Sequence, residues 1–422
     1  MSLREFINKV EERGELLRIE RNVNPKLEIA RILNENSNRV VLFENVGNSN
    51  YRVVGNLCNK RENFAIALNV GTGDLLHRII SAIENPTKPE IIKNGNCQEV
   101  VEYDPNLFEI PIPTYTSRDM GPYITSGVFI ANDPEYGFNM SFHRASPISK
   151  NELVARICHR DLYRYIKKSK NEIEVAICIG LDLSVLLAAA ISTDIKTNEL
   201  EIANSLSRVE LVRCKTKDIL VPADSEIVLE GNITMRKHKE GPFPDITKTY
   251  DIVREEFVIK IDCITHRRNP IFHALLPASK EHELLMGMPR EPIIYNAVNE
   301  VCKCRDVLLT HGGCSWLHCV IKIDKRNEDD GKKAINAAFK AHPSMKHVVV
   351  VDNDIDIHNM EEVEWAIATR FQAGRDLIIK KEKGSSLDPS ANEDRTTYKV
   401  GIDATIPFDM DGRKFKRIKL GE

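Results

Sequence analysis

The sequence predicts a mixed α/β protein built from three parts. Residues 1–105 alternate helix and strand patterns, residues 124–295 are rich in strand patterns, and residues 296–422 return to alternating helices and strands. Alternation favours a sheet covered by helices, whereas a run of strands favours a barrel or a sandwich. At about 100–200 residues per domain, a chain of 422 residues is long enough for two or three cores.

The first part begins with an amphipathic helix. Ser2 and Glu5 form a capping-box pattern, and Gly14 marks the end of the helix. Between them, apolar residues recur at helical spacing. A proline-rich stretch at 104–123 is the expected linker to the second part. The other elements expected before it are strands at 16–19, 40–43 and 51–54 and helices at 25–36 and 75–83.

The second and third parts differ in their apolar patterns. In the second, residues 256–263 alternate apolar and polar side chains and residues 227–229 follow a turn, so we expect a β-barrel or sandwich with inserted helices. In the third, a helical segment at 329–342 leads into the apolar Val348–Val351, which predicts a buried strand. The charged segment Lys380–Arg395 predicts a mobile loop.

Composition and charge exclude several classes of protein. The chain has 59 Lys and Arg against 62 Asp and Glu, whereas nucleic-acid-binding and membrane-surface proteins normally carry a basic excess. The best apolar stretch, Val175–Ser192, contains Asp182 and Ser184 and therefore predicts a buried strand followed by a buried helix. Because no apolar leader is present, we expect a cytoplasmic protein without nucleic-acid or membrane partners.

The ten cysteines form no Cys-x-x-Cys pair, and several lie in apolar strand patterns. We therefore expect buried free thiols in a reducing compartment. Cysteines and histidines gather between residues 302 and 319, but their spacings match no standard zinc finger. A structural zinc site is accordingly disfavoured.

Two charged motifs carry candidate chemistry. Glu240-Gly-Pro-Phe-Pro-Asp245 places two carboxylates around a Gly-Pro turn, which suits general acid–base catalysis. A solvated surface turn explains the same pattern equally well. The segment that starts at Asn139 ends in His143 and Arg144, and an arginine can clamp a carboxylate through two hydrogen bonds. For these residues alone, a surface salt bridge is the favoured alternative.

Taken in chain order, the motifs resemble those of the UbiD family of reversible decarboxylases, which use prenylated flavin mononucleotide (prFMN). The resemblance covers nearly all of the chain, and the ordered set is far more specific than a short Gly-Pro-Phe motif. It implies an N-terminal α/β domain (1–105), a central flavin-reductase-like split β-barrel domain that binds prFMN (106–295) and a C-terminal α/β oligomerisation domain (296–422). The matching segments are Asn139-x4-Arg144, Cys158-His159, Asn198–Leu206, Val221–Gly231, Glu240–Asp245, Val348–Asp356 and Glu362–Arg370.

The resemblance implies a cofactor site with a metal. Mn²⁺ or Mg²⁺ would be held by Asn139, His159 and Glu199, with K⁺ nearby on backbone carbonyls, and Glu201 is the alternative to Glu199. Oxygen donors with one imidazole suit these cations, and a buried flavin phosphate needs a counter-charge. Position 158 is Gln in some relatives and Cys here, so one contact is expected to differ. The further flavin contacts that the resemblance implies are Ser141, Phe142, His143, Arg144, Cys158 and Lys340.

The resemblance also implies a catalytic network of Arg144, Glu240 and Asp245. Arg144 would hold the substrate carboxylate, Asp245 would protonate carbon after CO₂ has left, and Glu240 would couple to Arg144. Loss of CO₂ from an sp² carbon leaves electrons that no side chain can accept, so a cofactor must carry that step. Asp at position 245 reaches less far than the Glu found in some relatives.

The length of the chain resembles that of the compact archaeal branch of the family. This implies decarboxylation of trans-anhydromevalonate 5-phosphate to isopentenyl phosphate and CO₂, a step of a mevalonate pathway of isoprenoid biosynthesis. The alternatives are an aromatic, hydroxybenzoate-like acid as substrate, a non-catalytic binding relative and, disfavoured because no His-Glu-x-x-His motif is present, a metal-dependent hydrolase. Candidate cations for a substrate phosphate are His143, Arg208, Arg236, Lys237 and Lys239.

Two kinds of protein partner follow from the resemblance. A flavin prenyltransferase is expected to supply the cofactor, because the apoprotein cannot carry out the reaction alone. A homodimer or a higher homo-oligomer is expected through the C-terminal domain.

Overall fold

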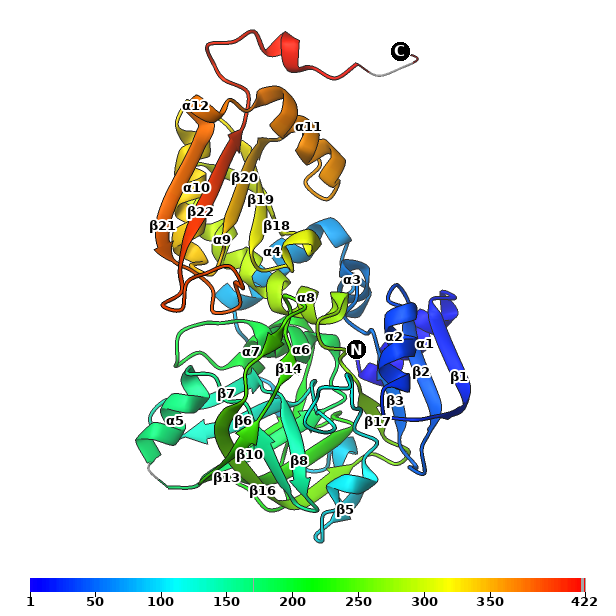
Figure 1. Cartoon of the computed structure of the whole chain (residues 1–422). Helices are drawn as coiled ribbons and strands as arrows, with labels where there is room; N and C mark the ends of the chain where they lie inside the picture. Colours follow the sequence, from blue (N-terminus) through cyan, green and yellow to red (C-terminus); the bar gives the residue numbers. More distant parts are fainter. Residues whose placement is uncertain (170, 419–420, 422) are drawn as a thin grey trace. The chain divides into compact units, whose positions relative to one another are not determined.

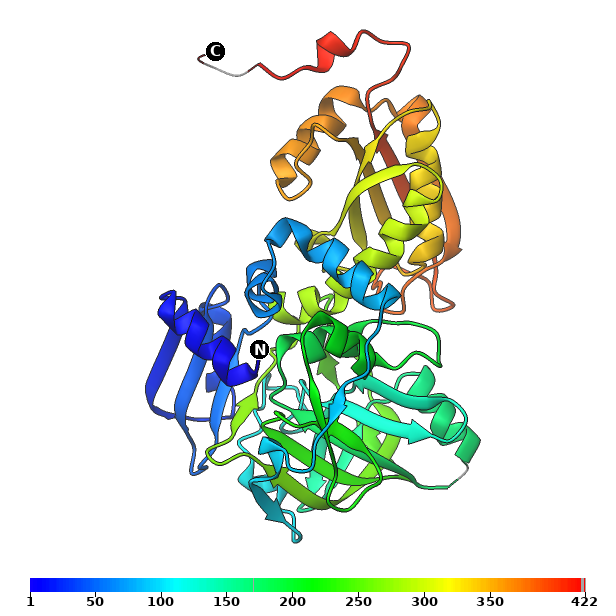
Figure 2. The same ribbon diagram turned by 180° about the vertical axis from the view of Figure 1, so that it is seen from behind.

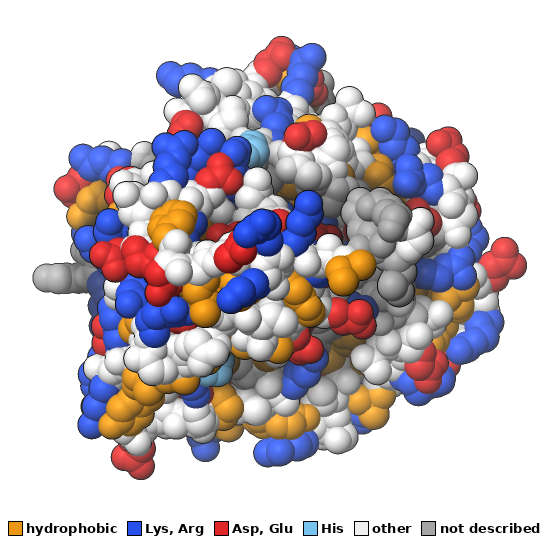
Figure 3. Space-filling view, turned by 90° about the horizontal axis from the view of Figure 1, so that it is seen from above, with side chains coloured by type: hydrophobic (Ala, Val, Ile, Leu, Met, Phe, Trp, Pro, Cys, Tyr) orange, Lys and Arg blue, Asp and Glu red, His pale blue; other side chains and the backbone are white. Residues whose placement is uncertain are grey.

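The computed structural model describes residues 1–169, 171–418 and 421 of the chain, which form two compact units, residues 1–285 and residues 286–422 (Figure 1). Helices and strands occur in both units, so the mixed α/β class predicted from the sequence is confirmed. Within the described residues, no helix is long and apolar enough to cross a membrane. Lys and Arg are interspersed with Asp and Glu on the face seen in Figure 3, in keeping with the balanced composition.

The first unit begins with a small sheet whose strand order is β1-β2-β3-β17. The helix α1 (Leu3–Glu12) lies against this sheet (Figure 2) and buries its predicted apolar residues. Both hydrogen bonds of the predicted capping box between Ser2 and Glu5 are present. The strands are β1 (Leu16–Val23), β2 (Val40–Val46), β3 (Arg52–Gly55) and β17 (Ile271–His273), and the next helices are α2 (Glu28–Glu35), α3 (Arg61–Leu68) and α4 (Leu75–Glu84).

The central sheet of the first unit has the strand order β7-β6-β10-β13-β16-β9-β8, and its pairs are antiparallel. The long strands β13 and β16 contain the predicted strand segments 227–229 and 256–263 (Figure 1). The bounds are β5 (Val100–Glu102, paired with β16), β6 (Val128–Asp133), β7 (Gly137–Phe142), β8 (Ala145–Ser149), β9 (Glu152–Ala155), β10 (Ile173–Ile179), β13 (Ile227–Glu240) and β16 (Arg254–His266).

Shorter elements surround this sheet. The predicted succession of buried strand and buried helix over Val175–Ser192 is confirmed, because β10 is followed by α6, whose N-terminus is capped by Asp182. The helices are α5 (Asp161–Ser169), α6 (Leu183–Ala190), α7 (Glu199–Leu206) and α8 (Lys280–Gly287), and the short strands are β4 (Glu90–Ile91), β11 (Glu210–Arg213), β12 (Leu220–Pro222), β14 (Phe243–Pro244) and β15 (Tyr250–Asp251).

Residues 104–123 do not form the expected linker. Leu107, Ile110, Tyr115 and Tyr123 are buried in the same core cluster as the central sheet. The prolines in this stretch restrict the backbone, but alternating apolar side chains still allow the segment to pack. The proline content was therefore a poor indicator of a loose connection here.

The second unit contains a sheet of strand order β18-β19-β20-β22-β21. The predicted strand at Val348–Val351 lies in β20, where Val348 and Val350 pack with α9 and α10 and Val349 and Val351 pack with α11. The strands are β18 (Lys303–Leu309), β19 (His318–Asp324), β20 (His347–Asp352), β21 (Leu377–Lys383) and β22 (Thr396–Ala404), and the helices are α9 (Glu291–Asn299), α10 (Asp330–Ala341), α11 (Met360–Arg370) and α12 (Ala373–Asp376).

Two expectations from the sequence are met only in part: the loop at Lys380–Arg395 and the burial of the cysteines. The segment Lys380–Arg395 is not a loop throughout, because its first residues belong to β21, where cross-strand pairing with β22 outweighs the charged composition. The cysteines are free, as predicted, and seven of them are buried, but Cys158 is exposed. Among the described residues, no group of three or more His, Cys, Asp or Glu side chains is arranged to hold a metal ion.

Candidate active site

Arg144 and Glu240 form a buried, two-pronged ion pair. Arg144 lies between β7 and β8, and Glu240 is the last residue of β13. The arginine Nε donates to Oε1 at 2.8 Å and Nη2 donates to Oε2 at 2.9 Å. The Glu240 side chain is 0% exposed and that of Arg144 is 11% exposed. Burial opposes the charge of Arg144, but the hydrogen bonds and charge of Glu240 outweigh it and raise the pKa of the guanidinium. The surface salt bridge is therefore excluded.

Asp245 completes the predicted network from the other side of the guanidinium. Its Oδ2 lies 3.9 Å from Nη1 of Arg144, close enough for an ion pair but too far for a hydrogen bond. The backbone N–H of Asp245 donates to the carbonyl of Thr249, and the N–H of Lys248 donates back to the carbonyl of Asp245. This tight turn fixes the carboxylate, which keeps 18% of its side chain exposed. The structure thus brings Arg144, Glu240 and Asp245 together.

Three residues that the sequence analysis missed support the network. The Tyr123 hydroxyl donates to Glu240 Oε1 at 3.0 Å and accepts from the N–H of Gly241. The ring of Phe243 lies under the guanidinium, 4.5 Å from its carbon. Asp251 Oδ2 accepts from Arg144 Nη2 at 3.0 Å. Tyr123 lies in the supposed linker and Asp251 in a two-residue strand, so neither carried a local sequence signal.

Gly241 allows the chain to turn between Glu240 and Phe243. Its φ is +96°, a value that side chains with a Cβ rarely adopt, and a Cβ there would lie 3.0 Å from the carbonyl oxygen of Ile252. The glycine of the Glu-Gly-Pro-Phe motif therefore has a steric role. It lets the buried end of β13 pass directly into the short hairpin that carries Asp245.

His282 on α8 is a further titratable neighbour that the sequence analysis did not identify. Its Nδ1 accepts a hydrogen bond from the N–H of Ala278, which places the proton of the neutral ring on Nε2. Burial lowers the pKa of His282, partly offset by the charges of Asp245 and Glu283. The imidazole is therefore a neutral group within electrostatic reach of Asp245.

Asn139 and Glu199 of the predicted metal site lie side by side. Asn139 Nδ2 is 3.4 Å from Glu199 Oε1, and the N–H of Met140 donates to Glu199 Oε2 at 3.0 Å. Burial raises the pKa of Glu199 to about 7, against the effect of these hydrogen bonds. Glu199 rather than Glu201 is the glutamate in contact with Asn139.

His159 is placed differently from the other two predicted ligands. It is exposed, and its ring packs on Tyr163 with the ring centres 4.1 Å apart. Within the described part of the chain, it makes no hydrogen bond with Asn139 or Glu199. The amide oxygen of Asn139 and the carboxylate oxygens of Glu199 are hard donors that fit a divalent cation, and His159 stays a prediction as the third ligand.

The other predicted flavin contacts lie in three places: on β7 and just after it, in the segment that follows β9, and on α10. Ser141 bridges Asn139 Oδ1 and the Nε2 of His143. Burial lowers the pKa of His143 to about 4, and its Nδ1 lies 3.1 Å from the carbonyl oxygen of Arg156. Phe142 is half-buried at the end of β7, Cys158 is exposed, and Lys340 is an exposed residue of α10 in the second unit.

A basic pocket of about 420 Å³ lies beside the network. Arg254, at its wall, donates to Asp251 at 2.6 Å, and Asp251 in turn bonds Arg144. Burial lowers the pKa of Lys237, and the positive charges of Lys167 and Arg156 lower it further despite Glu256. The residues lining the pocket are Arg156, His159, Tyr163, Lys167, Met235, Lys237, Arg254, Glu255, Glu256 and Phe257.

The predicted phosphate-binding cations differ in whether they line this pocket. Lys237 lines it, whereas Arg208 is paired with Glu90 and Glu210 and Arg236 is paired with Glu152, all as exposed or largely exposed ion pairs. Lys239 is an exposed residue of β13. Lys237 is therefore the predicted cation that the structure places in a cavity with other basic groups.

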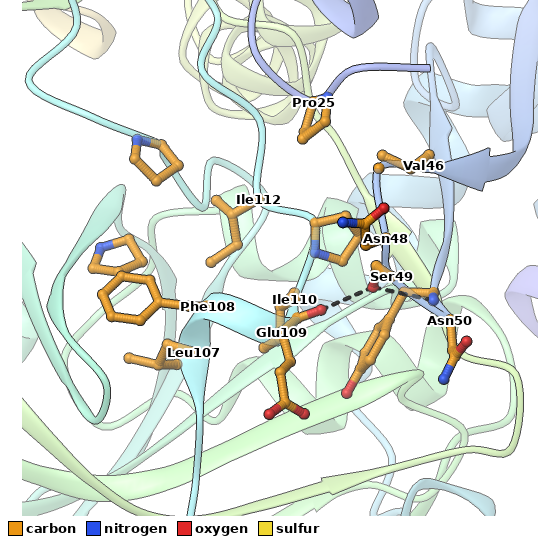
Figure 4. Close-up of a pocket in the computed structure, with 15 residues that line it drawn as sticks. Pro25, Val46, Asn48, Ser49, Asn50, Leu107, Phe108, Glu109, Ile110 and Ile112 are labelled. Carbon is orange, nitrogen blue, oxygen red and sulfur yellow. Dashed lines mark hydrogen bonds between the residues drawn. The ribbon is translucent and has the colours of Figure 1, made fainter. Parts of the chain in front are cut away.

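A second cavity, of about 540 Å³, lies in the same unit and is mainly apolar. Figure 4 shows Leu107, Phe108, Ile110 and Ile112 around it, opposite residues of the β2–β3 turn. Ser49 Oγ donates to the carbonyl of Glu109 at 2.8 Å and joins the two walls. None of the residues predicted for catalysis or for the cofactor lines this cavity.

Known protein families match almost the whole chain. Residues 7–83, 90–280 and 283–404 match the families described as the N-terminal, Rift-related and C-terminal domains of 3-octaprenyl-4-hydroxybenzoate carboxy-lyase. The chain belongs to the UbiD family. The resemblance inferred from the ordered motifs is thereby confirmed.

Among curated UbiD-family relatives, anhydromevalonate phosphate decarboxylase of Methanothermobacter thermautotrophicus is 45% identical over 100% of both chains. The protein of the same name from Methanocaldococcus jannaschii is 42% identical over 99% of both. Among solved structures, the UbiD-class enzyme HmfF from Pelotomaculum thermopropionicum in complex with FMN has a TM-score of 0.97 and 39% identity, covering 100% of this chain and 98% of that one. An evolved dimeric form of HmfF in complex with prFMN has a TM-score of 0.92 and 37% identity, covering 100% and 97%.

Proposed function

We propose that this protein is a prFMN-dependent decarboxylase that converts trans-anhydromevalonate 5-phosphate to isopentenyl phosphate and CO₂. The buried pair of Arg144 and Glu240, with Asp245 beside it, is the observation that carries the proposal. The full-length identity of 45% to an anhydromevalonate phosphate decarboxylase favours this substrate over an aromatic acid.

In this mechanism the side chains bind the acid and move one proton. When bound, prFMN supplies the electron sink for the pair of electrons left after CO₂ departs. Arg144 holds the substrate carboxylate through Nη1, because Glu240 and Asp251 occupy Nε and Nη2. Asp245 then gives a proton to the carbon that lost CO₂, since it is the network acid on the Nη1 side. Tyr123 and Glu240 keep the guanidinium oriented throughout.

The basic pocket supports a phosphorylated substrate. A phosphate monoester brings a charge of about −1.5 to −2, and the neighbouring cations Lys237 and Lys167 gain from such a partner. The link from Arg254 through Asp251 to Arg144 connects the proposed phosphate end with the proposed carboxylate end.

The proposed cofactor site includes Mn²⁺ or Mg²⁺, with K⁺ nearby. Asn139 and Glu199 supply hard oxygen donors, and the amide Nδ2 of Asn139 lies 3.4 Å from Glu199 Oε1; His159 is the third proposed ligand. Metal analysis of Glu199→Gln and its neighbour Glu201→Gln tests the assignment. We expect Glu199→Gln to lose bound metal and Glu201→Gln to keep it; the reverse result would make Glu201 the ligand.

Turnover by the holoenzyme tests the proposed reaction. The protein is co-expressed with a flavin prenyltransferase, its proposed cofactor supplier, and bound flavin is measured by absorbance and mass. It is then incubated with trans-anhydromevalonate 5-phosphate and, separately, with hydroxybenzoates, and CO₂ and products are followed. We expect isopentenyl phosphate from the phosphorylated acid. Turnover of hydroxybenzoates alone would replace this proposal with the aromatic-acid reaction. The proposed assembly, a homodimer or larger, is read from the molar mass of the same preparation.

A further inference from the structure

Asp251 is a third carboxylate on Arg144, outside the three-residue network. Its Oδ2 accepts from Arg144 Nη2 at 3.0 Å and lies 2.6 Å from Nη1 of Arg254. The side chain is 16% exposed. Burial alone would raise the pKa of Asp251, but Arg254 and Arg144 outweigh burial and hold that pKa below its usual value. Asp251 is therefore an anion shared by two arginines.

The hydrogen bonds of Arg144 are distributed unevenly over its nitrogens. Nε and Nη2 bind Glu240, and Nη2 also binds Asp251. Within the described part of the chain, Nη1 makes no hydrogen bond, and its nearest acid is Asp245 at 3.9 Å. Because a guanidinium is planar, two acids on the Nε and Nη2 edge also fix the direction in which Nη1 points.

Asp251 also belongs to the hairpin that carries Asp245. Phe243 pairs with Asp251 and Pro244 with Tyr250 across β14 and β15, and Asp245 begins the turn between them. The ion pair of Asp251 therefore joins this hairpin to Arg144. The neighbouring side chains of Ile252 and Val253 are exposed, so little apolar packing holds this end of the hairpin.

We propose that Asp251 is a positioning residue, which locks Arg144 and the Asp245 hairpin together so that Nη1 is left open for the substrate carboxylate beside the proton donor. This inference rests on the proposed decarboxylase function and adds a residue to it. A purely structural ion pair would change the stability of the protein without changing how the active protein binds its acid.

The test compares Asp251→Asn, Asp251→Ala and Asp251→Glu in the holoenzyme. Glu152→Gln is the matched control, because it removes a carboxylate from an arginine pair on the same sheet, away from the network. We measure kcat and KM, the pH profile of kcat/KM, flavin content and Tm. We expect Asp251→Ala to raise KM at least tenfold, Asp251→Asn to alter the pH profile, Asp251→Glu to recover part of the loss, and flavin content to stay unchanged.

A crystal structure of Asp251→Ala gives a readout that needs no substrate. We expect the guanidinium of Arg144 or the hairpin at residues 243–251 to shift from its place in the wild type. Wild-type KM and pH profile in Asp251→Ala and Asp251→Asn, or an unmoved Arg144 and hairpin, would overturn the inference. Failure of the wild type to turn over trans-anhydromevalonate 5-phosphate would instead reject the proposed substrate, and the structural comparison would still decide the role of Asp251.

Discussion

Arg144 has three acidic neighbours, and their distances from its guanidinium indicate different roles. Glu240 and Asp251 are within hydrogen-bond distance of the guanidinium, and Arg144 helps to hold the pKa of Asp251 below its usual value, whereas Asp245 is 3.9 Å away and retains solvent access. An acid that is fully engaged in a buried ion pair is a poor proton donor, because protonation would leave the arginine charge buried and unpaired. Asp245 is therefore the member of the set that is suited to donate a proton.

Asp245→Asn tests this assignment at the residue scale. Because an amide cannot donate a proton as an acid does, we expect kcat to fall by about 10²–10⁴-fold, the usual contribution of general acid–base catalysis. Flavin content and Tm should stay close to wild type, since Asp245 is not part of the Arg144–Glu240 hydrogen bonds. Asp245→Glu should retain measurable turnover. Wild-type kcat in Asp245→Asn would show that another group supplies the proton.

Asp352, at the end of β20, gives a pH prediction. Burial raises its pKa to about 6 from 3.8, although Arg370 and the N–H of Ile406 oppose the shift. A folded-state pKa above the unfolded value favours the protonated form, so this contribution to stability is lost as pH rises from about 4 through 6. The free energy of unfolding of wild type minus that of Asp352→Asn should therefore decrease over this window. Denaturant unfolding at pH 4, 5, 6 and 7 measures it, and a difference independent of pH would contradict the assignment.

At the scale of elements, sequence patterns predicted the helices and strands whose formation depends on local periodicity. The capping box and apolar spacing predicted α1, and four consecutive valines predicted the buried strand β20, whose side chains alternate between two helical layers. The motif Glu240–Asp245 predicted two acids of the network. The predictions that were wrong concern segments whose structure depends on tertiary packing. Tyr123 lies in a supposed linker, and β21 runs into a charged segment because β22 supplies its hydrogen bonds.

Residues of β13, β16 and α5 line the basic pocket. Substitution of Lys237 tests whether this pocket binds the substrate phosphate. A hydrogen bond to a charged group contributes about 1.5–3 kcal/mol, and about 1.4 kcal/mol corresponds to a tenfold change in binding. We therefore expect Lys237→Gln to raise KM for the phosphorylated acid about tenfold or more. Lys239→Gln, two residues along the same strand and exposed, should leave KM unchanged. A loss of bound flavin in Lys237→Gln, with KM unaffected, would assign the pocket to the cofactor phosphate instead.

At the scale of the whole molecule, one large hydrophobic cluster lies within the first compact unit and two further clusters lie within the second. The large cluster contains residues from Val23 to Leu276, and the two clusters of the second unit contain residues from Ile294 to Ala404. Because cooperative unfolding follows shared cores, a chain of this kind is expected to depart from a single two-state transition.

A pair of matched core substitutions tests this division. Val350 in β20 and Val175 in β10 are both fully buried, and each loses two methyl groups on substitution by alanine. Each change should cost about 2 kcal/mol through lost burial and an unfilled cavity. By calorimetry, we expect Val350→Ala to lower one unfolding transition and Val175→Ala to lower the other. If both variants shift one common transition equally, the two units unfold as one, and the active protein must then be described as a single cooperative body.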